Sequence, residues 1–231
     1  MELIEEAKEE VRIQESEVRS DLSEILNLLD DIKINLVKIH EHGSRADSIV
    51  KSMLEHSRGG SGKPEPTNFN ALVKEFTNLS FHGMRASKEP INVDMKYELD
   101  ESIGELPLVA EDFSRVIVNL CNNAFDAMRE KLTADSRQLS AEPNQRYEPR
   151  LTIRTIKNDS TITLEIEDNG PGIPEDMKDK IMQPFFTTKK GTQGTGLGLS
   201  ITNDIIKAHG GSLDLRTTVN RGTIFTIKLT S

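Results

Sequence analysis

The sequence predicts an α+β fold, in which a mixed five-stranded sheet carries helices on one face and a long helical hairpin precedes it. Before residue 58, apolar residues recur at helical spacing. After residue 68, the predicted helices fall between strands or hairpins rather than in strict βα alternation, which favours a mixed sheet over a doubly wound one. The stretch SRGGSGKPEPTN (57–68) is rich in Gly, Ser and Pro and indicates a linker. The expected units are therefore a helical hairpin at 1–57, a linker at 58–67 and a domain at 68–231.

A long helix is predicted over roughly 20–57, because apolar or small residues alternate there in steps of three and four, the heptad spacing of a coiled coil or bundle. These residues are Leu22, Ile25, Leu29, Ile32, Leu36, Ile39, Gly43, Ala46, Val50 and Met53. A shorter stripe at Ile4, Ala7 and Val11 precedes them, and the polar stretch RIQESEVRSD (12–21) is expected to turn the chain back into the hairpin. The two helices would reach ~18 Å and ~57 Å, so most of the apolar stripe of the longer helix has no partner within the hairpin. A second copy of the chain, or sequence upstream, would have to cover it.

Helices and strands are predicted in mixed order along the later segments. TNFNALVKEFTNLSFHGM is expected to be a helix capped by Thr67 or Asn68, INVDMKYEL a strand, and EDFSRVIVNLCNNAFDAM a helix with an acidic first turn. Two hairpins, LTIRTIK with TITLEIED and SLDLRTT with TIFTIKL, flank a helix that ends at Gly210 and Gly211. The polar residues 129–150 are expected to form an exposed excursion.

Composition excludes several classes of protein. A net charge of −9 argues against a general nucleic-acid binder, which would carry a basic excess. Cys121 is the single cysteine, so no disulfide framework can form within the chain. With no signal peptide and no sufficiently long apolar run, a cytoplasmic location is expected, and a membrane anchor could lie only on a longer parent chain.

Asn119, Asn123 and Asp126 stand at i, i+4 and i+7 of a predicted helix. Their side chains therefore point within about 60° of one another and form one stripe beside the apolar face. The alternative for any one of them is that it is an ordinary polar residue on the protein surface. Three in line suggest a ligand site, because an amide oxygen suits a Mg²⁺ ion that keeps several waters and shares phosphate oxygens.

Asp168 alternates with Ile162, Leu164 and Ile166 along a predicted strand, so its carboxylate is expected to be buried beside apolar residues. A buried charge needs a donor, and the glycines of the following NGPG would let a flat ligand approach the backbone. The alternative is an aspartate that caps its own turn. The stretch GTGLGL (194–199) places further glycines before a helix, which raises the question of what approaches so closely.

The segments NLCNNAFDAM (119–128), DNGPGI (168–173), PFFTTK (184–189), GTGLGL (194–199) and RGTIF (221–225) have the order and spacing of five family motifs, the N, G1, F, G2 and G3 boxes. The chain therefore resembles the GHKL ATP-binding superfamily, and more closely the catalytic domain of sensor histidine kinases. This resemblance implies a two-layer, Bergerat-type ATP fold. In addition, KIHEHGSRADSIVKSMLEHSR (38–58) resembles the second helix of the dimerisation and phosphotransfer hairpin in these kinases.

The resemblance also implies roles for individual residues. Asp168 would accept a hydrogen bond from the adenine amino group, Asn123 would hold Mg²⁺ and Asn119 would lie close to the phosphates. Residues 174–194 would form a lid, in which Phe185 and Phe186 are either core plugs or base-stacking residues and Lys189 and Lys190 are candidate phosphate partners. The implied ATP-binding set is Asn119, Asn123, Asp126, Asp168, Gly170, Gly172, Ile173, Phe186, Lys189, Gly194, Thr195, Gly196, Leu197, Gly198, Leu199 and Thr223.

The first N-box position discriminates within the superfamily. Its ATP-hydrolysing members resemble one another in carrying a glutamate as general base, whereas Asn119 cannot accept a proton usefully at pH 7. A kinase is therefore expected, which positions the γ-phosphate for a nucleophile carried elsewhere.

The family's phosphoacceptor histidine is absent from residues 1–20, and His40 with Glu41 lacks the rest of its pattern. We therefore expect the ATP-binding portion of a sensor histidine kinase, starting after the acceptor, with ATP and Mg²⁺ as cofactors. A homodimer and a response-regulator receiver domain are the expected partners. The alternatives are a nucleotide-switched regulatory binding module and an anti-sigma-type serine kinase.

Overall fold

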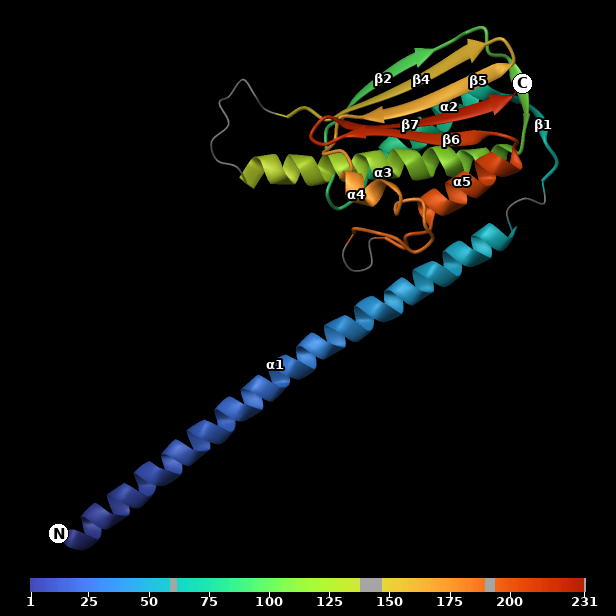
Figure 1. Cartoon of the computed structure of the whole chain (residues 1–231). Helices are drawn as coiled ribbons and strands as arrows, with labels where there is room; N and C mark the ends of the chain where they lie inside the picture. The colour runs from blue at the N-terminus through green and yellow to red at the C-terminus, as the bar shows by residue number, and fades with distance from the viewer. Residues whose placement is uncertain (59–61, 138–146, 190–193, 231) are drawn as a thin grey trace.

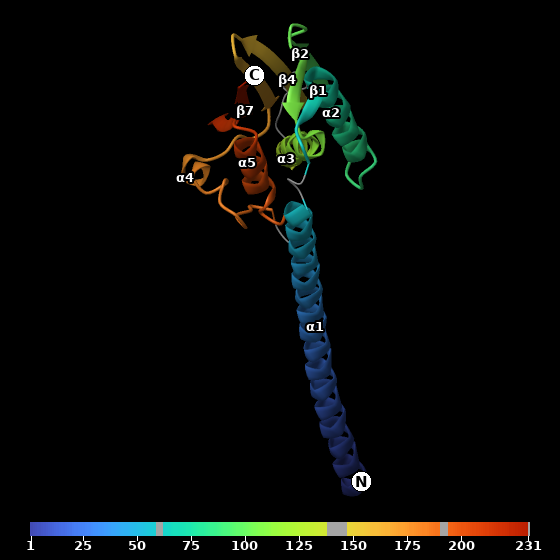
Figure 2. The same cartoon turned by 90° about the vertical axis from the view of Figure 1, so that its right-hand side faces the viewer.

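The N-terminal part of the protein is one continuous helix. The computed structural model describes residues 1–58, 62–137, 147–189 and 194–230. Helix α1 (Glu2–Arg58) runs for 57 residues and extends away from the rest of the chain (Figures 1 and 2). The expected turn at 12–21 is therefore wrong, because that stretch contains neither Gly nor Pro and its residues are all compatible with a helix. Within the described ranges, no helix is both long and apolar enough to pass through a lipid bilayer.

The apolar side chains of α1 are exposed along its middle portion. Leu22, Leu29 and Leu36 keep 56%, 55% and 60% of their surface accessible. Burying such a regular stripe is what normally stabilises a long helix, since propensity alone contributes little. The described chain therefore offers this surface to something other than its own core.

The C-terminal part is built on a five-stranded sheet with the order β2-β4-β5-β7-β6. Its strands are β2 (Asp94–Leu99), β4 (Arg150–Asn158), β5 (Thr161–Asp168), β6 (Ser212–Thr218) and β7 (Gly222–Thr230). The β2–β4 pair is parallel and the other three pairs are antiparallel, which confirms the predicted mixed sheet.

The helices α2 (Phe69–Arg85), α3 (Ala110–Arg137) and α5 (Gly198–Ala208) lie together on one face of this sheet (Figures 1 and 2). The Asn68 side chain accepts a hydrogen bond of 3.0 Å from the backbone of Ala71, so Asn68 caps α2 as predicted. A single turn of helix, α4 (Glu175–Lys178), precedes α5 in the chain. The result is the expected two-layer α+β architecture.

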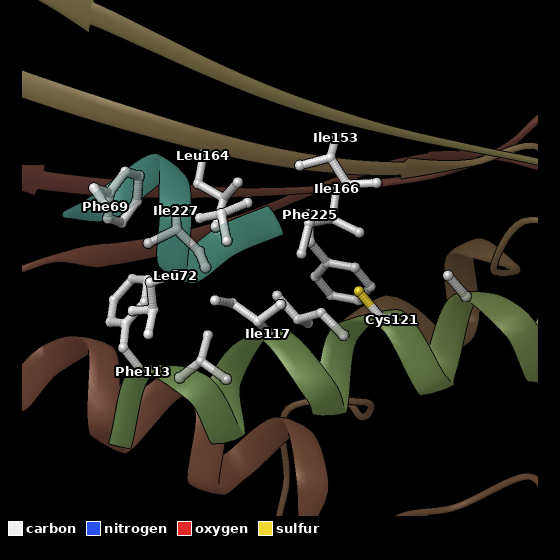
Figure 3. Packing of buried hydrophobic residues seen from close by; sticks show 14 of the residues in the cluster. Phe69, Leu72, Phe113, Ile117, Cys121, Ile153, Leu164, Ile166, Phe225 and Ile227 are labelled. Carbon is white, nitrogen blue, oxygen red and sulfur yellow. The ribbon is translucent and has the colours of Figure 1, made fainter. Parts of the chain in front are cut away.

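The core lies between α3 and the sheet, as Figure 3 shows. From α3, Phe113 and Ile117 are fully buried and face Leu164 of β5 and Ile227 of β7. The Phe69 ring of α2 packs at 5.6 Å from the Phe113 ring. This packing fixes which side of α3 faces the sheet, and so fixes which side is left for a ligand.

Two features differ from the sequence prediction. An antiparallel pair of short strands, β1 (Glu65–Asn68) and β3 (Glu105–Leu108), was missed, and β1 occupies the end of the predicted linker. Each strand has four residues and one contains Pro66, the other Pro107, so neither shows a strand pattern. In addition, α3 continues to Arg137, so part of the predicted excursion at 129–150 is helical. Residues 138–146 lie outside the described chain.

Candidate functional site

The predicted polar stripe of α3 lies at the edge of the core, where Asn119, Asn123 and Asp126 are half-buried. The Asn119 Nδ2 atom donates to the carbonyl of Gly198, at 3.4 Å, where α5 begins. The Nζ atom of Lys189 lies 3.5 Å from Asn123 Oδ1 and 2.5 Å from Asp126 Oδ2. The fold thus brings the stripe into contact with both the lysine of the F box and the glycine cluster of the G2 box.

The oxygens of Asn123 and Asp126 form a cation-binding pair. Besides Lys189, Asp126 binds the guanidinium of Arg129, with Nη1 2.6 Å from Oδ1. Among the described residues there is no group of three or more His, Cys, Asp or Glu side chains that could hold a metal ion. A Mg²⁺ ion bound by an amide oxygen would complete its coordination with water and phosphate oxygens. The ammonium group already lying between these oxygens shows that their chemistry suits a cation.

Asp168 ends β5 and is 5% exposed, as its alternation with apolar residues predicted. Its Oδ1 accepts the backbone N–H of Gly170 at 2.8 Å. Desolvation by burial raises the pKa of Asp168 to about 6, although the N–H groups of Gly170 and Thr223 and the charge of Lys131 lower it. The carboxylate is therefore largely ionised at pH 7, but it is held in a setting that disfavours its charge.

Glycine is required in the turn that follows Asp168. Gly172 has φ +71°, and a Cβ there would lie 2.3 Å from the Thr218 carbonyl oxygen. A Cβ on Gly170 would lie 3.2 Å from the Cβ of Ala127, so the turn packs closely on α3, one residue beyond Asp126. The G1 turn and the polar stripe of α3 are thereby neighbours.

The hydroxyl of Thr217 links this turn to β7. It accepts the N–H of Ile173 at 2.8 Å and lies 3.1 Å from the hydroxyl of Thr223. Thr223 is 4% exposed and pairs with Asp168 across the β5–β7 ladder. The predicted G1 and G3 residues therefore meet at one end of the sheet.

The glycine cluster packs against the F box. Gly196 has φ +71°, and a Cβ there would lie 2.4 Å from the carbonyl carbon of Phe185. The N–H of Phe185 donates to the Gly196 carbonyl at 2.9 Å. Phe185 is 52% exposed and Phe186 is half-buried, so the interpretation of Phe185 as a core plug is wrong. The close backbone approach leaves no room at Gly196 for a side chain.

The remaining residues of the G2 box lie around the start of α5. A Cβ on Gly194 would lie 2.6 Å from the Thr187 hydroxyl, and the Thr195 hydroxyl accepts the N–H of Leu197 at 3.3 Å. Leu197 is buried, and Leu199 packs against the core. A pocket of about 270 Å³ lies between α3 and this segment. Its lining includes Ser114, Arg115, Val118, Asn119, Thr195 and Leu197. Lys190 lies outside the described residues.

Sequence reasoning missed Lys131, Tyr147 and Asn169. The interpretation of 129–150 as an exposed excursion concealed the first two of them. The available signal was the spacing of Lys131 from Ala127, because residues at i and i+4 share one helix face. Lys131 binds the turn that follows Asp168.

Comparison with known proteins identifies the class that this fold and site define. Residues 109–231 match the family of histidine kinase-, DNA gyrase B- and HSP90-like ATPases. The chain belongs to this family.

Several relatives are sensor kinases. The sensor kinase CckA of Brucella abortus is 33% identical over 199 residues, which cover 84% of this chain and 20% of CckA. The signal transduction histidine-protein kinase AtoS of Escherichia coli is 31% identical over 185 residues, which cover 79% of this chain and 26% of AtoS. The chain thus spans about a fifth to a quarter of the length of these two relatives.

Solved structures share the fold. The catalytic domain of the histidine kinase ThkA, in a nucleotide-free form, superposes with a TM-score of 0.57 at 29% identity, over 73% of this chain and 96% of that domain. ThkA in complex with the response regulator protein TrrA gives a TM-score of 0.61 at 26% identity, over 83% of this chain and 49% of ThkA.

We predict that replacing Asp168 by Asn stabilises the unliganded protein at neutral pH. Because the folded-state pKa of Asp168 lies above the ordinary value of 3.8, the wild type loses stability as the pH rises from about 4 to about 6. The D168N variant escapes this loss and should gain up to about 3 kcal/mol at pH 8. Thermal unfolding of both proteins at pH 5 and pH 8 measures the difference. Asp204→Asn, on an exposed residue of α5, is the control, and a D168N variant less stable than wild type at pH 8 would contradict the prediction.

Proposed function

We propose that this chain is the ATP-binding catalytic part of a sensor histidine kinase, which transfers the γ-phosphate of ATP to a histidine outside this sequence. One observation carries the proposal: a buried carboxylate, Asp168, ends a strand on a glycine turn that packs against the helix bearing Asn119, Asn123 and Asp126. A recognition group for a base and a cation-binding stripe for phosphates are thereby joined in one site.

At the base end, Asp168 accepts a hydrogen bond from the 6-amino group of adenine. Gly170 and Gly172 keep the floor of the site free of side chains. Thr223 and Ile173 border this end of the site. Guanine carries a carbonyl oxygen at position 6, which cannot donate and would face the carboxylate oxygens, so adenine is preferred. This preference depends on the ionised form of Asp168.

At the phosphate end, Asn123 holds Mg²⁺, and Asp126, Lys189 and Asn119 complete the polar surroundings. Mg²⁺ supplies positive charge that neutralises the phosphate oxygens. Gly194, Gly196 and Gly198 keep backbone N–H groups accessible, and α5 begins at Gly198 with its N-terminal dipole end available to an anion. Thr195, Leu197 and Leu199 shape this loop, and Phe186 borders it.

The kinase activity, rather than hydrolysis, follows from Asn119. A carboxylate at this position would activate water, whereas the carboxamide is neutral and its Nδ2 donates to the Gly198 carbonyl. The named functions of CckA, AtoS and ThkA support the same choice. The nucleotide-switched module and the serine kinase gain no support from these relatives.

The partner that takes the phosphate from this histidine is a response-regulator receiver domain. The complex of ThkA with TrrA supports this assignment, since this chain superposes on that kinase. The same proposal places the domain in the bacterial cytoplasm, where ATP and receiver domains are found, with any membrane anchor on another part of the parent protein.

We predict that Asn123→Ala weakens the binding of Mg·ATP by about tenfold or more, because the amide oxygen that binds the metal ion is lost. Binding of ATP in the presence of EDTA should change little in the variant. Calorimetric titration with and without Mg²⁺ measures both effects. Asn122→Ala, on the exposed neighbouring residue, is the matched control. Equal Mg²⁺ dependence in Asn123→Ala and wild type would contradict the assignment of the metal ligand.

We predict that the chain phosphorylates a separately produced helical hairpin domain that carries the parent's acceptor histidine. Label from γ-³²P-ATP should appear on the hairpin and should be lost in acid but kept in alkali, as expected for a phosphoramidate. An acid-stable product would indicate a serine kinase. Release of phosphate without labelling would indicate an ATPase.

We also propose that the chain dimerises through α1. Leu26, Leu28, Ile34 and Val37 are also more than half exposed, so the apolar surface of α1 is wider than a two-helix seam and suits a bundle. We predict that the chain is a dimer by light scattering and that Leu29→Asp with Leu36→Asp makes it a monomer, since charges would be buried. Lys38→Asp, at the heptad position that Glu24 and Asp31 also occupy, should stay dimeric. A monomeric wild type would contradict this proposal.

A further inference from the structure

Lys131 lies in the extended part of α3 and is half-buried. Its Nζ atom donates to the carbonyl oxygens of Asn169 at 2.9 Å, Gly170 at 3.2 Å and Asn220 at 3.0 Å. An ammonium group has three donors, so its hydrogen-bonding capacity is fully used. The same atom lies 4.5 Å from the centre of the Tyr147 ring, which adds a cation–π contact.

The carbonyls that Lys131 binds belong to two different turns. Asn169 and Gly170 follow β5, and Asn220 lies between β6 and β7. These turns meet beside Asp168, because a Cβ on Gly222 would lie 1.9 Å from the Asp168 carbonyl oxygen. A single side chain from α3 therefore ties together both turns that border the buried carboxylate.

The side chain of Asn169 holds the same turn from the opposite side. Its Oδ1 accepts the N–H of Arg150 at 2.8 Å and the hydroxyl of Tyr147 at 3.0 Å, and its Nδ2 donates to the Glu148 carbonyl at 2.8 Å. Burial, and secondarily the charge of Asp168, raises the pKa of Tyr147, so its hydroxyl remains a donor. The turn is clamped between α3 and the start of β4.

The clamp acts on Asp168 in two ways. Lys131 fixes the Gly170 residue whose N–H donates to Asp168 Oδ1 at 2.8 Å. Desolvation by burial raises the pKa of Asp168 most, the N–H groups of Gly170 and Thr223 and the positive charge of Lys131 lower it, and the charge of Glu167 adds a smaller rise. An apolar side chain of the same length could pack at this place, but it would leave three carbonyls without this donor and the carboxylate without this cation.

We propose that Lys131 is a positioning residue for base recognition, which orients the turn after Asp168 and places its ammonium group beside the carboxylate that selects adenine. This inference rests on the proposed nucleotide site at Asp168. It adds a residue outside the five motifs, and it gives the extension of α3 beyond Met128 a functional role.

The test compares Lys131→Met with Lys131→Arg, which keeps the charge, and with Lys74→Met on an exposed lysine of α2 as the matched control. The full chain is titrated with Mg·ATP and Mg·GTP by calorimetry between pH 5.5 and 8.5. At pH 7, Lys131→Met should bind ATP about tenfold more weakly and discriminate less against GTP, whereas Lys131→Arg should stay within about threefold of wild type.

The pH dependence separates this role from a merely structural one. Loss of a neighbouring cation raises the pKa of a carboxyl group, so the pH at which ATP affinity is halved should move upward in Lys131→Met by about half a unit or more. The phosphates of ATP titrate equally with wild type and with Lys131→Met. The difference between the two affinity-against-pH curves therefore comes from the protein. In an Asp168→Asn background, Lys131→Met should have little further effect on the discrimination between ATP and GTP.

The outcomes are distinguishable. If wild type does not bind Mg·ATP, the proposed function fails. If wild type binds but a folded Lys131→Met shows the same affinity and the same pH midpoint, the role of Lys131 is refuted. If Lys131→Met does not fold, Lys131→Gln, which removes the charge but keeps a donor, is measured for the same midpoint shift, and an unchanged midpoint there again refutes the proposal.

Discussion

The packing of α3 against the sheet is the constraint on which the rest of the structure depends. Phe113, Ile117 and Cys121 are fully buried, and together they set the rotation of the helix about its axis. With that rotation fixed, Asn119, Asn123 and Asp126 can lie only along the border of the core. The same packing brings Ala127 against Gly170, so the turn after Asp168 is positioned by the helix as well as by its own strand.

A cost in stability accompanies this arrangement. A carboxylate that is 5% exposed loses most of its hydration, and two backbone N–H groups and a lysine compensate only in part, because the pKa of Asp168 is still raised. An amino group on a ligand would supply a further donor to the same oxygens. The site is therefore less stable when empty than an apolar site of the same shape, and part of the binding energy of a ligand comes from relieving this cost.

Electrostatics connect the two ends of the site to elements that are distant in the sequence. Lys189 contacts Asp126, 63 residues earlier, and Lys131 contacts Asn169, 38 residues later. Each lysine places an ammonium group beside oxygens that belong to the candidate site, one at the proposed phosphate end and one at the proposed base end. Their surroundings differ, since Lys131 is bound by neutral carbonyls and Lys189 by a carboxylate and an amide. Lys189 thus forms an ion pair with Asp126, whereas Lys131 holds two turns together through their carbonyls.

Features that depend on local periodicity could be predicted from the sequence. The alternation of Ile162, Leu164, Ile166 and Asp168 predicted a buried carboxylate, the helical spacing of Asn119, Asn123 and Asp126 predicted a shared face, and the helix and hairpin signals predicted the mixed sheet. The short strands β1 and β3 were not predictable, because four residues with a proline form a strand only when a partner is supplied.

The tertiary structure alone decided which loops meet. The close packing of Gly196 on Phe185 and the clamp at Lys131 both involve competition between alternatives that a local pattern leaves equal. A lysine in a polar segment looks the same in the sequence whether it points into water or into three carbonyls. Only the folded chain distinguishes these cases, because the carbonyls that bind Lys131 come from residues 169, 170 and 220 and are brought together by the sheet.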